Sequence, residues 1–328
     1  MDDLSKLFED ALREIQAAQR IIIHRHSRPD GDAYGSQLGF YLLVKANFPD
    51  KEVYMVGDSN ERLAFMLAGR TMDDIPSSFY TDALAVIMDT SAPTLISDDR
   101  WSLAKRTLRF DHHLFLGRIA DVEVIDSSFE SCCGILALFA KECGFNVPND
   151  AAQAIFTGIV TDSGRFRYDA VNARTFELAA FLMQRNIDTS FIYRNLYTEE
   201  LSFVKLRARF ALRVKTTAHN VAYTYTTRKE LLEDGIDATT ATRAFVNVMG
   251  DIKGVDVWVA FAEGDEGIAC ELRSANRNIN PIAVKYGGGG HAKASGATVN
   301  SQSIAMDMLR DLDALAEGKT ATNTLETT

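Results

Sequence analysis

The sequence predicts a two-domain α/β protein whose larger, N-terminal domain is built on an open, mostly parallel sheet. Apolar runs typical of buried strands alternate with helical patterns over the first half of the chain. Beyond residue 212, shorter segments of alternating polarity suggest hairpins instead. The chain has 328 residues, of which 46% are hydrophobic, so it is long enough to form more than one hydrophobic core.

Helices and strands alternate in the first half of the chain. Apolar residues recur at helical spacing in three segments, residues 2–19, 33–46 and 150–161. Short apolar runs typical of strands fall at residues 21–23, 53–56, 84–89 and 107–110. The run over 84–89 is continuously apolar up to its last residue, as expected of a strand that is covered on both faces. Ligands of such a sheet bind beyond the carboxyl ends of its strands.

The second half of the chain predicts a smaller α/β domain. Residues 172–213 look helical and would complete the first domain and supply a connector. Two strand pairs follow, 212–217 with 221–227 and 255–262 with 267–273, and a helix at about 239–250 lies between them. The predicted boundaries are residues 1–185 for the first domain, 186–214 for a helical linker, 215–317 for the second domain and 318–328 for a flexible tail.

Composition narrows the classes of protein. The net charge of −10 disfavours a protein that grips long duplex nucleic acid, which needs a broad basic surface. No apolar stretch approaches the roughly 18 residues of a membrane span, and the acidic start is unlike a signal peptide. The four cysteines form no CxxC pair and are expected to be buried thiols in a reducing cytoplasm.

One loop, residues 26–36, offers an imidazole and two carboxylates within seven residues. His26, Asp30 and Asp32 follow the first predicted strand and precede a helix. Imidazole with carboxylate suits a divalent metal ion. The alternative is a polar turn in which Asp30 or Asp32 caps the following helix.

Further polar groups end later strands or adjoin helices. They are Asp89, Asp111-His112-His113 and Asp162. Each alone could be an ordinary strand-end or capping residue. Because parallel strands present their carboxyl ends at one edge, these groups are expected to converge, and uncompensated carboxylates would repel one another. Two divalent cations, about 3.5–4 Å apart, would relieve this repulsion. The absence of a thiolate ligand favours Mn, Fe or Mg over zinc.

The segment around four consecutive glycines is the second candidate site. Gly287–Gly290 and His291 are interpreted as a backbone loop whose amides meet an anionic group, or alternatively as a flexible hinge. Arg273 offers a fork that suits phosphate, although a solvated Arg at a strand end is the simpler interpretation. Ser274 adds a hydroxyl. The candidate substrate-binding residues are Arg273, Ser274, Gly288, Gly289, Gly290 and His291.

Together, these motifs resemble the DHH phosphoesterase superfamily. The order HxxxDxD, strand-end Asp, Asp-His-His and Thr-Asp-Ser-Gly-Arg-Phe is similar to its catalytic domain. The segment Leu272-Arg273-Ser274 with the glycine-rich run resembles its associated substrate-binding domain. The resemblance spans roughly residues 20–300 and is strongest to the nanoRNase and pAp-phosphatase branch.

The resemblance implies a role for each matching residue. His26 and Asp30 would hold one metal ion, Asp32 and His112 the other, and Asp89 and Asp162 would be shared or bridging. His113 would contact the scissile phosphate as the catalytic residue, and Asp111 would orient an imidazole. The segment after the histidines, Leu114-Phe115-Leu116-Gly117-Arg118, departs from the polar loop that is common in the family. Substrate preference is expected to differ there, or Arg118 to supply a contact.

The function implied is a metal-dependent hydrolase of short oligoribonucleotides to 5′-mononucleotides and of pAp to AMP and phosphate. Its cofactors would be two divalent ions, Mn²⁺ first, with Mg²⁺ or Co²⁺ as alternatives. Its partners would be short RNA and pAp, with no membrane and no long duplex, and a homodimer is left open. The rival functions are a linear or cyclic dinucleotide phosphodiesterase, a RecJ-like exonuclease, a pyrophosphatase, or a nucleotide-binding sensor without catalysis.

Overall fold

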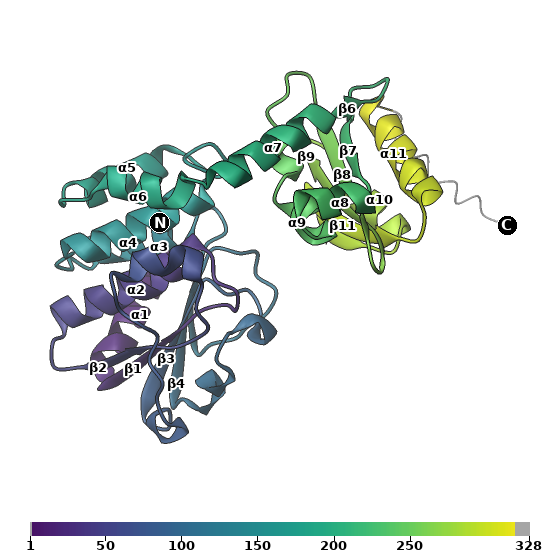
Figure 1. The fold of residues 1–328 in the computed structure, drawn as a ribbon. Helices are drawn as coiled ribbons and strands as arrows, with labels where there is room; N and C mark the ends of the chain where they lie inside the picture. The colour runs from purple at the N-terminus through teal and green to yellow at the C-terminus, as the bar shows by residue number, and fades with distance from the viewer. Residues whose placement is uncertain (1, 319–328) are drawn as a thin grey trace. The chain divides into compact units, whose positions relative to one another are not determined.

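A computed structural model describes residues 2–318 (Figure 1). Two compact units divide the chain, with the boundary between Thr198 and Glu199. This boundary falls inside the segment 186–214 that was predicted to be a helical linker. The predicted tail, residues 318–328, lies outside the described residues apart from Gly318.

The first unit is built on a five-stranded sheet in which every neighbouring pair is parallel. Its strands are β1 (Arg20–His24), β2 (Glu52–Met55), β3 (Ala83–Met88), β4 (Arg106–Asp111) and β5 (Val122–Ile125). They are ordered β2-β1-β3-β4-β5, so the strand order reverses between β1 and β3. In sheets of this kind ligands bind at such a switch point, beyond the carboxyl ends of the strands.

Helices gather on one face of this sheet (Figure 1). They are α1 (Asp2–Ala17), α2 (Gly31–Asn47), α3 (Cys132–Glu142), α4 (Asn149–Asp162), α5 (Ala173–Met183) and α6 (Thr189–Tyr197). Ile21 and Ile23 join the helices in the main core, whereas Ile22 points to a smaller cluster with Tyr80. Four short 3₁₀ helices complete the unit, η1 (Glu61–Leu67), η2 (Ser77–Phe79), η3 (Pro93–Leu95) and η4 (Asp99–Leu103).

Two glycines let α2, α3 and α4 approach one another beneath the strand edge. A Cβ on Gly35 would lie 2.6 Å from the carbonyl oxygen of Ala154, and one on Gly158 would lie 2.3 Å from Cys133 Sγ. Neither position has room for a side chain, because these distances are well inside van der Waals contact. This close packing brings α3 and α4 to the start of α2, where the loop that contains His26 and Asp30 ends.

The second unit contains a mixed six-stranded sheet ordered β10-β11-β9-β8-β7-β6. Its strands are β6 (Lys215–Thr216), β7 (Ala222–Thr226), β8 (Val257–Gly264), β9 (Gly267–Ser274), β10 (Gly289–His291) and β11 (Ala294–Val299). Its helices are α7 (Leu201–Arg213), α8 (Arg228–Asp234), α9 (Ala238–Arg243), η5 (Val246–Met249), α10 (Asn280–Lys285) and α11 (Gln302–Ala316). Helices α10 and α11 contribute to one core cluster, and α7, α8 and α9 to another.

The predicted α/β fold class is confirmed, and the segment predicted to be helical, 172–213, forms three helices. Asp188 caps the second of them by accepting a hydrogen bond from Phe191 N at 2.8 Å. One predicted element needs correction. The helix predicted at about 239–250 ends at Arg243 and is followed by the 3₁₀ helix η5. Val246 and Val248 in this part are β-branched, which lowers helix propensity. The sequence interpretation also omitted β5, α3, α8, β10, β11, α10 and α11.

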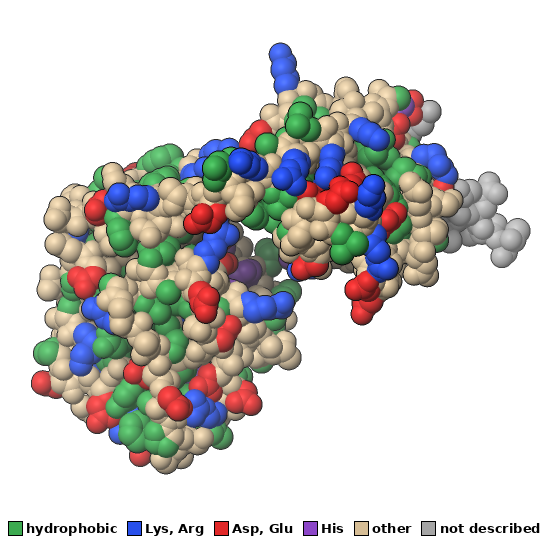
Figure 2. Space-filling view, in the orientation of Figure 1, with side chains coloured by type: hydrophobic (Ala, Val, Ile, Leu, Met, Phe, Trp, Pro, Cys, Tyr) green, Lys and Arg blue, Asp and Glu red, His purple; other side chains and the backbone are tan. Residues whose placement is uncertain are grey.

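Surface charge is mixed on the face shown in Figure 2, where Lys and Arg side chains alternate with Asp and Glu over each unit. That pattern agrees with the net charge of −10 and differs from the continuous basic surface of proteins that grip duplex DNA. Among residues 2–318, no helix combines the length and the apolarity that crossing a membrane requires.

Candidate metal centre

The loop between β1 and α2 brings His26 and Asp30 to the carboxyl edge of the sheet. Asp30 is the N-cap of α2, and its Oδ1 accepts hydrogen bonds from the backbone amides of Asp32 and Ala33, each at 3.0 Å. The same carboxylate oxygen lies 3.8 Å from His26 Nε2. Asp30 therefore caps the helix, which confirms that interpretation, and also faces the histidine, while metal binding stays a prediction.

The ring of His26 is oriented by its own loop. Its Nδ1 lies 2.9 Å from the carbonyl oxygen of Ser27, which can only accept, so Nδ1 carries the proton of the neutral ring. Nε2 is then free to act as a lone-pair donor. It lies 3.6 Å from Asp89 Oδ2. This is the arrangement expected of an imidazole that binds a cation through Nε2.

Asp89 is the centre of the cluster. It follows β3 in the left-handed region, with φ of 50°, which is costly for a residue other than glycine. Its side chain is 3% exposed, and Oδ1 finds no hydrogen-bond partner among the described residues. That oxygen lies 3.5 Å from His112 Nε2. A buried carboxylate that faces His26 with one oxygen and His112 with the other fits the position of a ligand shared by two cations.

Asp32, His112 and Asp162 form a second group. His112 Nε2 lies 3.9 Å from Asp32 Oδ2 and 3.3 Å from Asp162 Oδ2. Asp162 is the last residue of α4 and belongs to this group alone, whereas Asp89 groups with His26 and Asp30 and, separately, with His112 and His113. The ligand atoms within each group lie within 4.8 Å of one another, which is close enough for one metal ion.

The start of α3 holds the Asp32 carboxylate in place. Asp32 Oδ2 accepts a hydrogen bond from Cys132 N at 2.7 Å, and Oδ1 accepts one from Cys133 N at 2.9 Å. The N-terminus of a helix favours negative charge, so this contact stabilises the carboxylate. The adjacent cysteines are buried free thiols, as predicted, but their backbone amides have a role that their residue type does not indicate.

Burial and crowding of carboxylates shift the pKa values of this cluster. Burial, with the neighbouring carboxylates, raises the pKa of Asp32 well above its ordinary value. Burial also raises the pKa of Asp162 to about 7. Although burial opposes it, hydrogen bonding to Asp30 and Asp89 raises the pKa of His26 to about 10. The negative charge of the clustered carboxylates therefore favours bound protons. Divalent cations would compensate the same carboxylate charge.

His113 is engaged differently from the other histidines. Its Nδ1 lies 2.7 Å from Asp111 Oδ1, and that hydrogen bond raises the pKa of His113. Asp111 is fully buried and in turn pairs with the buried Arg109. Since Nδ1 is occupied, only Nε2 of this half-exposed ring is available for a further contact.

The segment after His113 presents an apolar tip. Leu114, Phe115 and Leu116 are 74%, 61% and 74% exposed. Arg118, which was considered as a substrate contact, donates to the carbonyl oxygens of Ala120, at 2.9 Å, and Asp121. Its guanidinium is therefore used to close its own loop.

The turn after Asp162 has an unusual backbone. Gly164, Arg165 and Phe166 all have positive φ, of 56°, 63° and 63°. Each non-glycine residue in this region costs about 1–2 kcal/mol. The turn is supported by Ser163 Oγ, which accepts a hydrogen bond from Phe166 N at 2.9 Å. Backbone strain of this kind is concentrated at functional sites, and here it adjoins a candidate ligand.

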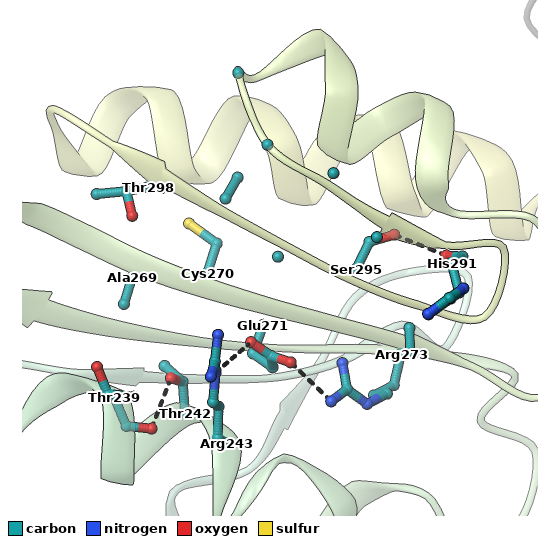
Figure 3. A pocket seen from close by; sticks show the side chains of 17 residues that line it. Thr239, Thr242, Arg243, Ala269, Cys270, Glu271, Arg273, His291, Ser295 and Thr298 are labelled. Atoms are coloured by element: carbon teal, nitrogen blue, oxygen red, sulfur yellow. Dashed lines mark hydrogen bonds and ion pairs between the residues drawn. The ribbon is translucent and has the colours of Figure 1, made fainter. Parts of the chain in front are cut away.

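The second unit contains a pocket of about 670 Å³ that includes most of the predicted substrate-binding residues (Figure 3). Arg273 Nη2 lies 2.7 Å from Glu271 Oε1, and Arg243 Nε lies 3.6 Å from Glu271 Oε2. Ser274 does not line this pocket, and its Oγ accepts a hydrogen bond from Arg277 N at 2.6 Å. Its contact with substrate stays a prediction.

The glycine run forms a turn and an edge strand rather than a free loop. A Cβ on Gly288 would lie 2.0 Å from the carbonyl oxygen of Gly296, so glycine is required for the packing itself. Gly289, Gly290 and His291 form β10, at the edge of the sheet, and are exposed. An edge strand leaves backbone groups without a sheet partner, which is the property expected of an anion-binding backbone.

Sequence interpretation missed the contribution of α9 to this pocket. Thr239, Thr242 and Arg243 line it, and Figure 3 shows Arg243 beside Glu271 and Arg273. These residues belong to no recognisable motif. Predicting a helix over 239–250 does not show which of its side chains face a pocket. Only the packing of α9 against β9 in the folded unit places Arg243 beside Glu271.

Comparison with known proteins agrees with this architecture. The family described as DHH family, N-terminal domain, matches residues 20–159, and the DHHA1 domain matches residues 219–318. The chain therefore belongs to the DHH family, in the form that carries a DHHA1 domain. The two matches correspond to the unit with the carboxylate–histidine cluster and the unit with the glycine-rich edge strand.

The proteins that match nearly the whole chain include two named relatives and one solved structure. The bifunctional oligoribonuclease and PAP phosphatase NrnA of Bacillus subtilis is 33% identical, over 94% of this chain and 98% of its own length. The protein of the same name from Mycoplasma genitalium is 33% identical over 92% of this chain and 95% of its own length. An exopolyphosphatase-related protein from Bacteroides fragilis shares the fold, with a TM-score of 0.83 at 24% identity, over 95% of this chain and 98% of its own.

Proposed function

We propose that this protein is a metal-dependent phosphoesterase that hydrolyses short oligoribonucleotides to 5′-mononucleotides and pAp to AMP and phosphate. The observation that carries the proposal is the convergence of two ligand groups on the buried carboxylate of Asp89. The similarity over almost the full length of relatives named as oligoribonuclease and PAP phosphatase supports the substrates.

In this proposal, each group of side chains holds one divalent ion. His26, Asp30 and Asp89 would hold the first, and Asp32, His112 and Asp162, together with Asp89, the second. Two such ions, preferably Mn²⁺ with Mg²⁺ or Co²⁺ as alternatives, would supply a water that ionises near neutral pH and compensate charge on the phosphate. The all-oxygen-and-imidazole donor set suits these metals.

His113 would act on the substrate itself. The hydrogen bond to Asp111 raises the pKa of His113, which favours the protonated form of the ring. Nε2–H can then donate to a non-bridging oxygen of the phosphate, where negative charge accumulates during displacement. Water adds to phosphorus, the bond to the ribose oxygen breaks, and the proton of the water ends on the departing oxygen.

The second unit would bind the far end of the substrate. Arg273 is 23% exposed within its pocket, and its guanidinium, which pairs with Glu271 and donates to Leu272 O, would turn part of its planar fork to the phosphate. Strand β10 offers exposed backbone amides beside it. A substrate engaged at both ends is selected by length, so short oligomers and pAp are preferred over long strands. We further propose that the protein acts in the cytoplasm, which suits its four free cysteines, and that a homodimer is its first candidate assembly.

Length selection is tested by incubating the protein and Mn²⁺ with pAp, pApA, a 5-mer RNA, a 24-mer RNA and pyrophosphate. We expect rapid loss of pAp and the short oligomers while the 24-mer and pyrophosphate persist. Preferential loss of the 24-mer would favour a RecJ-like exonuclease. Absence of turnover of every substrate would favour a nucleotide-binding sensor instead.

Substitution of Arg273 by Gln is expected to raise KM by about 10- to 100-fold, with kcat changed much less. A hydrogen bond to a charged group is worth roughly 1.5–3 kcal/mol, and binding of the distal phosphate would lose at least one. The measurement is steady-state hydrolysis of pApA. Arg310→Gln is the matched control, because Arg310 is 73% exposed and pairs with Asp307 outside the pocket. Equal KM values for R273Q and R310Q would remove Arg273 from the binding site.

A further inference from the structure

Residues 25–30, here called the metal-ligand loop, are hydrogen-bonded to two other loops through residues that are not candidate ligands. Ser27 N donates to Leu95 O at 2.7 Å, and Ser97 N donates to Arg25 O at 3.0 Å. These bonds connect the loop after β1 to the loop after β3. The loop that follows β2 contains Asp58, whose side chain contacts Arg25 and the backbone of Arg28.

Arg25 is the buried residue of this hydrogen-bond network. It is fully buried directly before His26, and its Nε donates to Gln37 Oε1 at 2.9 Å. Its Nη1 lies 3.2 Å from both the carbonyl oxygen of His26 and Asp58 Oδ1. The guanidinium also lies 4.7 Å from the ring centre of Tyr34. Arg25 thus ties the backbone of His26 to α2 and to Asp58.

Asp58 is the only carboxylate paired with Arg25 among the ion pairs of residues 2–318. Besides Arg25 Nη1, its side chain accepts hydrogen bonds from Ser97 Oγ at 2.5 Å and from Arg28 N at 2.8 Å. Arg28 has a left-handed backbone, with φ of 53°. Asp58 therefore supports the one residue of the loop whose backbone conformation is costly, two residues before Asp30.

We infer that Asp58, acting through Arg25 and the Arg28 amide, is a positioning residue that sets the affinity of the His26–Asp30–Asp89 metal position. A buried guanidinium needs a counter-charge, and removing one partner of such a pair permits its neighbours to move. The neighbours here are the backbone of His26 and the turn leading to Asp30. Residues that orient metal ligands typically change metal affinity by 10- to 100-fold when altered.

The inference rests on the proposed metal-dependent function and is tested by direct binding of Mn²⁺. The full-length protein is freed of metal and titrated with Mn²⁺, with free Mn²⁺ followed by electron paramagnetic resonance. For Asp58→Asn we expect one of two Mn²⁺ sites to weaken by about 10- to 100-fold while the other is unchanged. Ser97→Ala removes two hydrogen bonds with Asp58, one to its carboxylate and one from its backbone amide, but keeps its charge, and is expected to weaken the same site by a smaller factor.

The matched control is Asp150→Asn in the same unit. Asp150 pairs with Arg70 at 3.4 Å on the surface and is not among the candidate ligands, so its loss should leave both Mn²⁺ affinities unchanged. Thermal unfolding of the metal-free variants separates positioning from plain destabilisation. A lower midpoint for D58N with unchanged Mn²⁺ affinity would overturn the inference. If D58N does not fold, unchanged affinity in S97A overturns it equally.

Failure of the inference and failure of the proposed function give different results. If the unaltered protein binds no Mn²⁺, the metal-dependent function itself is wrong. If it binds two ions and D58N binds both with the same affinities, the function stands and only the role of Asp58 is rejected.

Discussion

Replacing Asp89 by Asn should reduce turnover of pAp and pApA on the order of 10³-fold or more. Asp89 is the one carboxylate that adjoins both candidate metal groups, with Oδ2 near His26 and Oδ1 near His112. Loss of the shared negative charge weakens both metal positions at once. Metal ions contribute several kcal/mol to such reactions, and each 1.36 kcal/mol is a tenfold change in rate.

A comparison with His113→Asn shows whether this loss arises from metal binding. His113 Nδ1 is occupied by Asp111, so this variant should lose turnover while still binding two Mn²⁺ ions. D89N should lose turnover and Mn²⁺ binding together. The measurements are initial rates at several Mn²⁺ concentrations and direct Mn²⁺ titration. Near-normal turnover in D89N would show that the two-metal assignment is wrong.

In the absence of added metal, the free energy of unfolding of the first unit should fall as pH rises from 6.5 to 8.5. The pKa of His26 is raised to about 10 in the folded protein, against about 6.5 when unfolded, chiefly by hydrogen bonds to Asp30 and Asp89 that outweigh burial. The folded state therefore holds this proton more tightly, and the stability it confers is lost as pH rises through that range. The raised pKa of His113 acts in the same direction.

Added Mn²⁺ should reverse this trend, because metal ligands bind in their deprotonated forms. A ligand present at 100 times its dissociation constant stabilises by about 2.7 kcal/mol, which for a unit of this size raises Tm by roughly 5–10 °C. The difference in Tm between Mn²⁺ and EDTA should therefore grow from pH 6.5 to 8.5. Calorimetric scans of the full chain measure it, with D89N as the control in which Mn²⁺ has little effect. A difference that shrinks with rising pH would contradict the assignment of His26 as a ligand.

Much of the candidate metal centre could be predicted from local patterns. His26, Asp89 and His112 each follow a short apolar run, and the carboxyl ends of parallel strands necessarily meet at one edge. Their convergence therefore needed only the correct assignment of β1, β3 and β4 as neighbouring parallel strands. The predicted strands matched those elements to within a residue or so at each end.

The individual roles of the carboxylates could not be predicted in the same way. Asp89 and Asp162 were both predicted to be shared or bridging; Asp89 belongs to two candidate groups and Asp162 to one, so their sharing stays a prediction. Asp162 ends a helix rather than a strand, and its distance from each group depends on how α4 packs against α2. That packing is set by glycine contacts such as Gly35 against Ala154, whose partners are not apparent from either segment alone.

The sequence by itself determined the fold class, the chemical character of the site and most of its candidate ligands, because strand-end position and residue type are local properties. Only the tertiary structure decided which groups support those ligands. The α3 amides beneath Asp32, the Asp58–Arg25 pair behind His26 and the place of Arg243 in the pocket are examples. Each joins segments 28 to 101 residues apart, and such contacts depend on packing geometry that no local periodicity encodes.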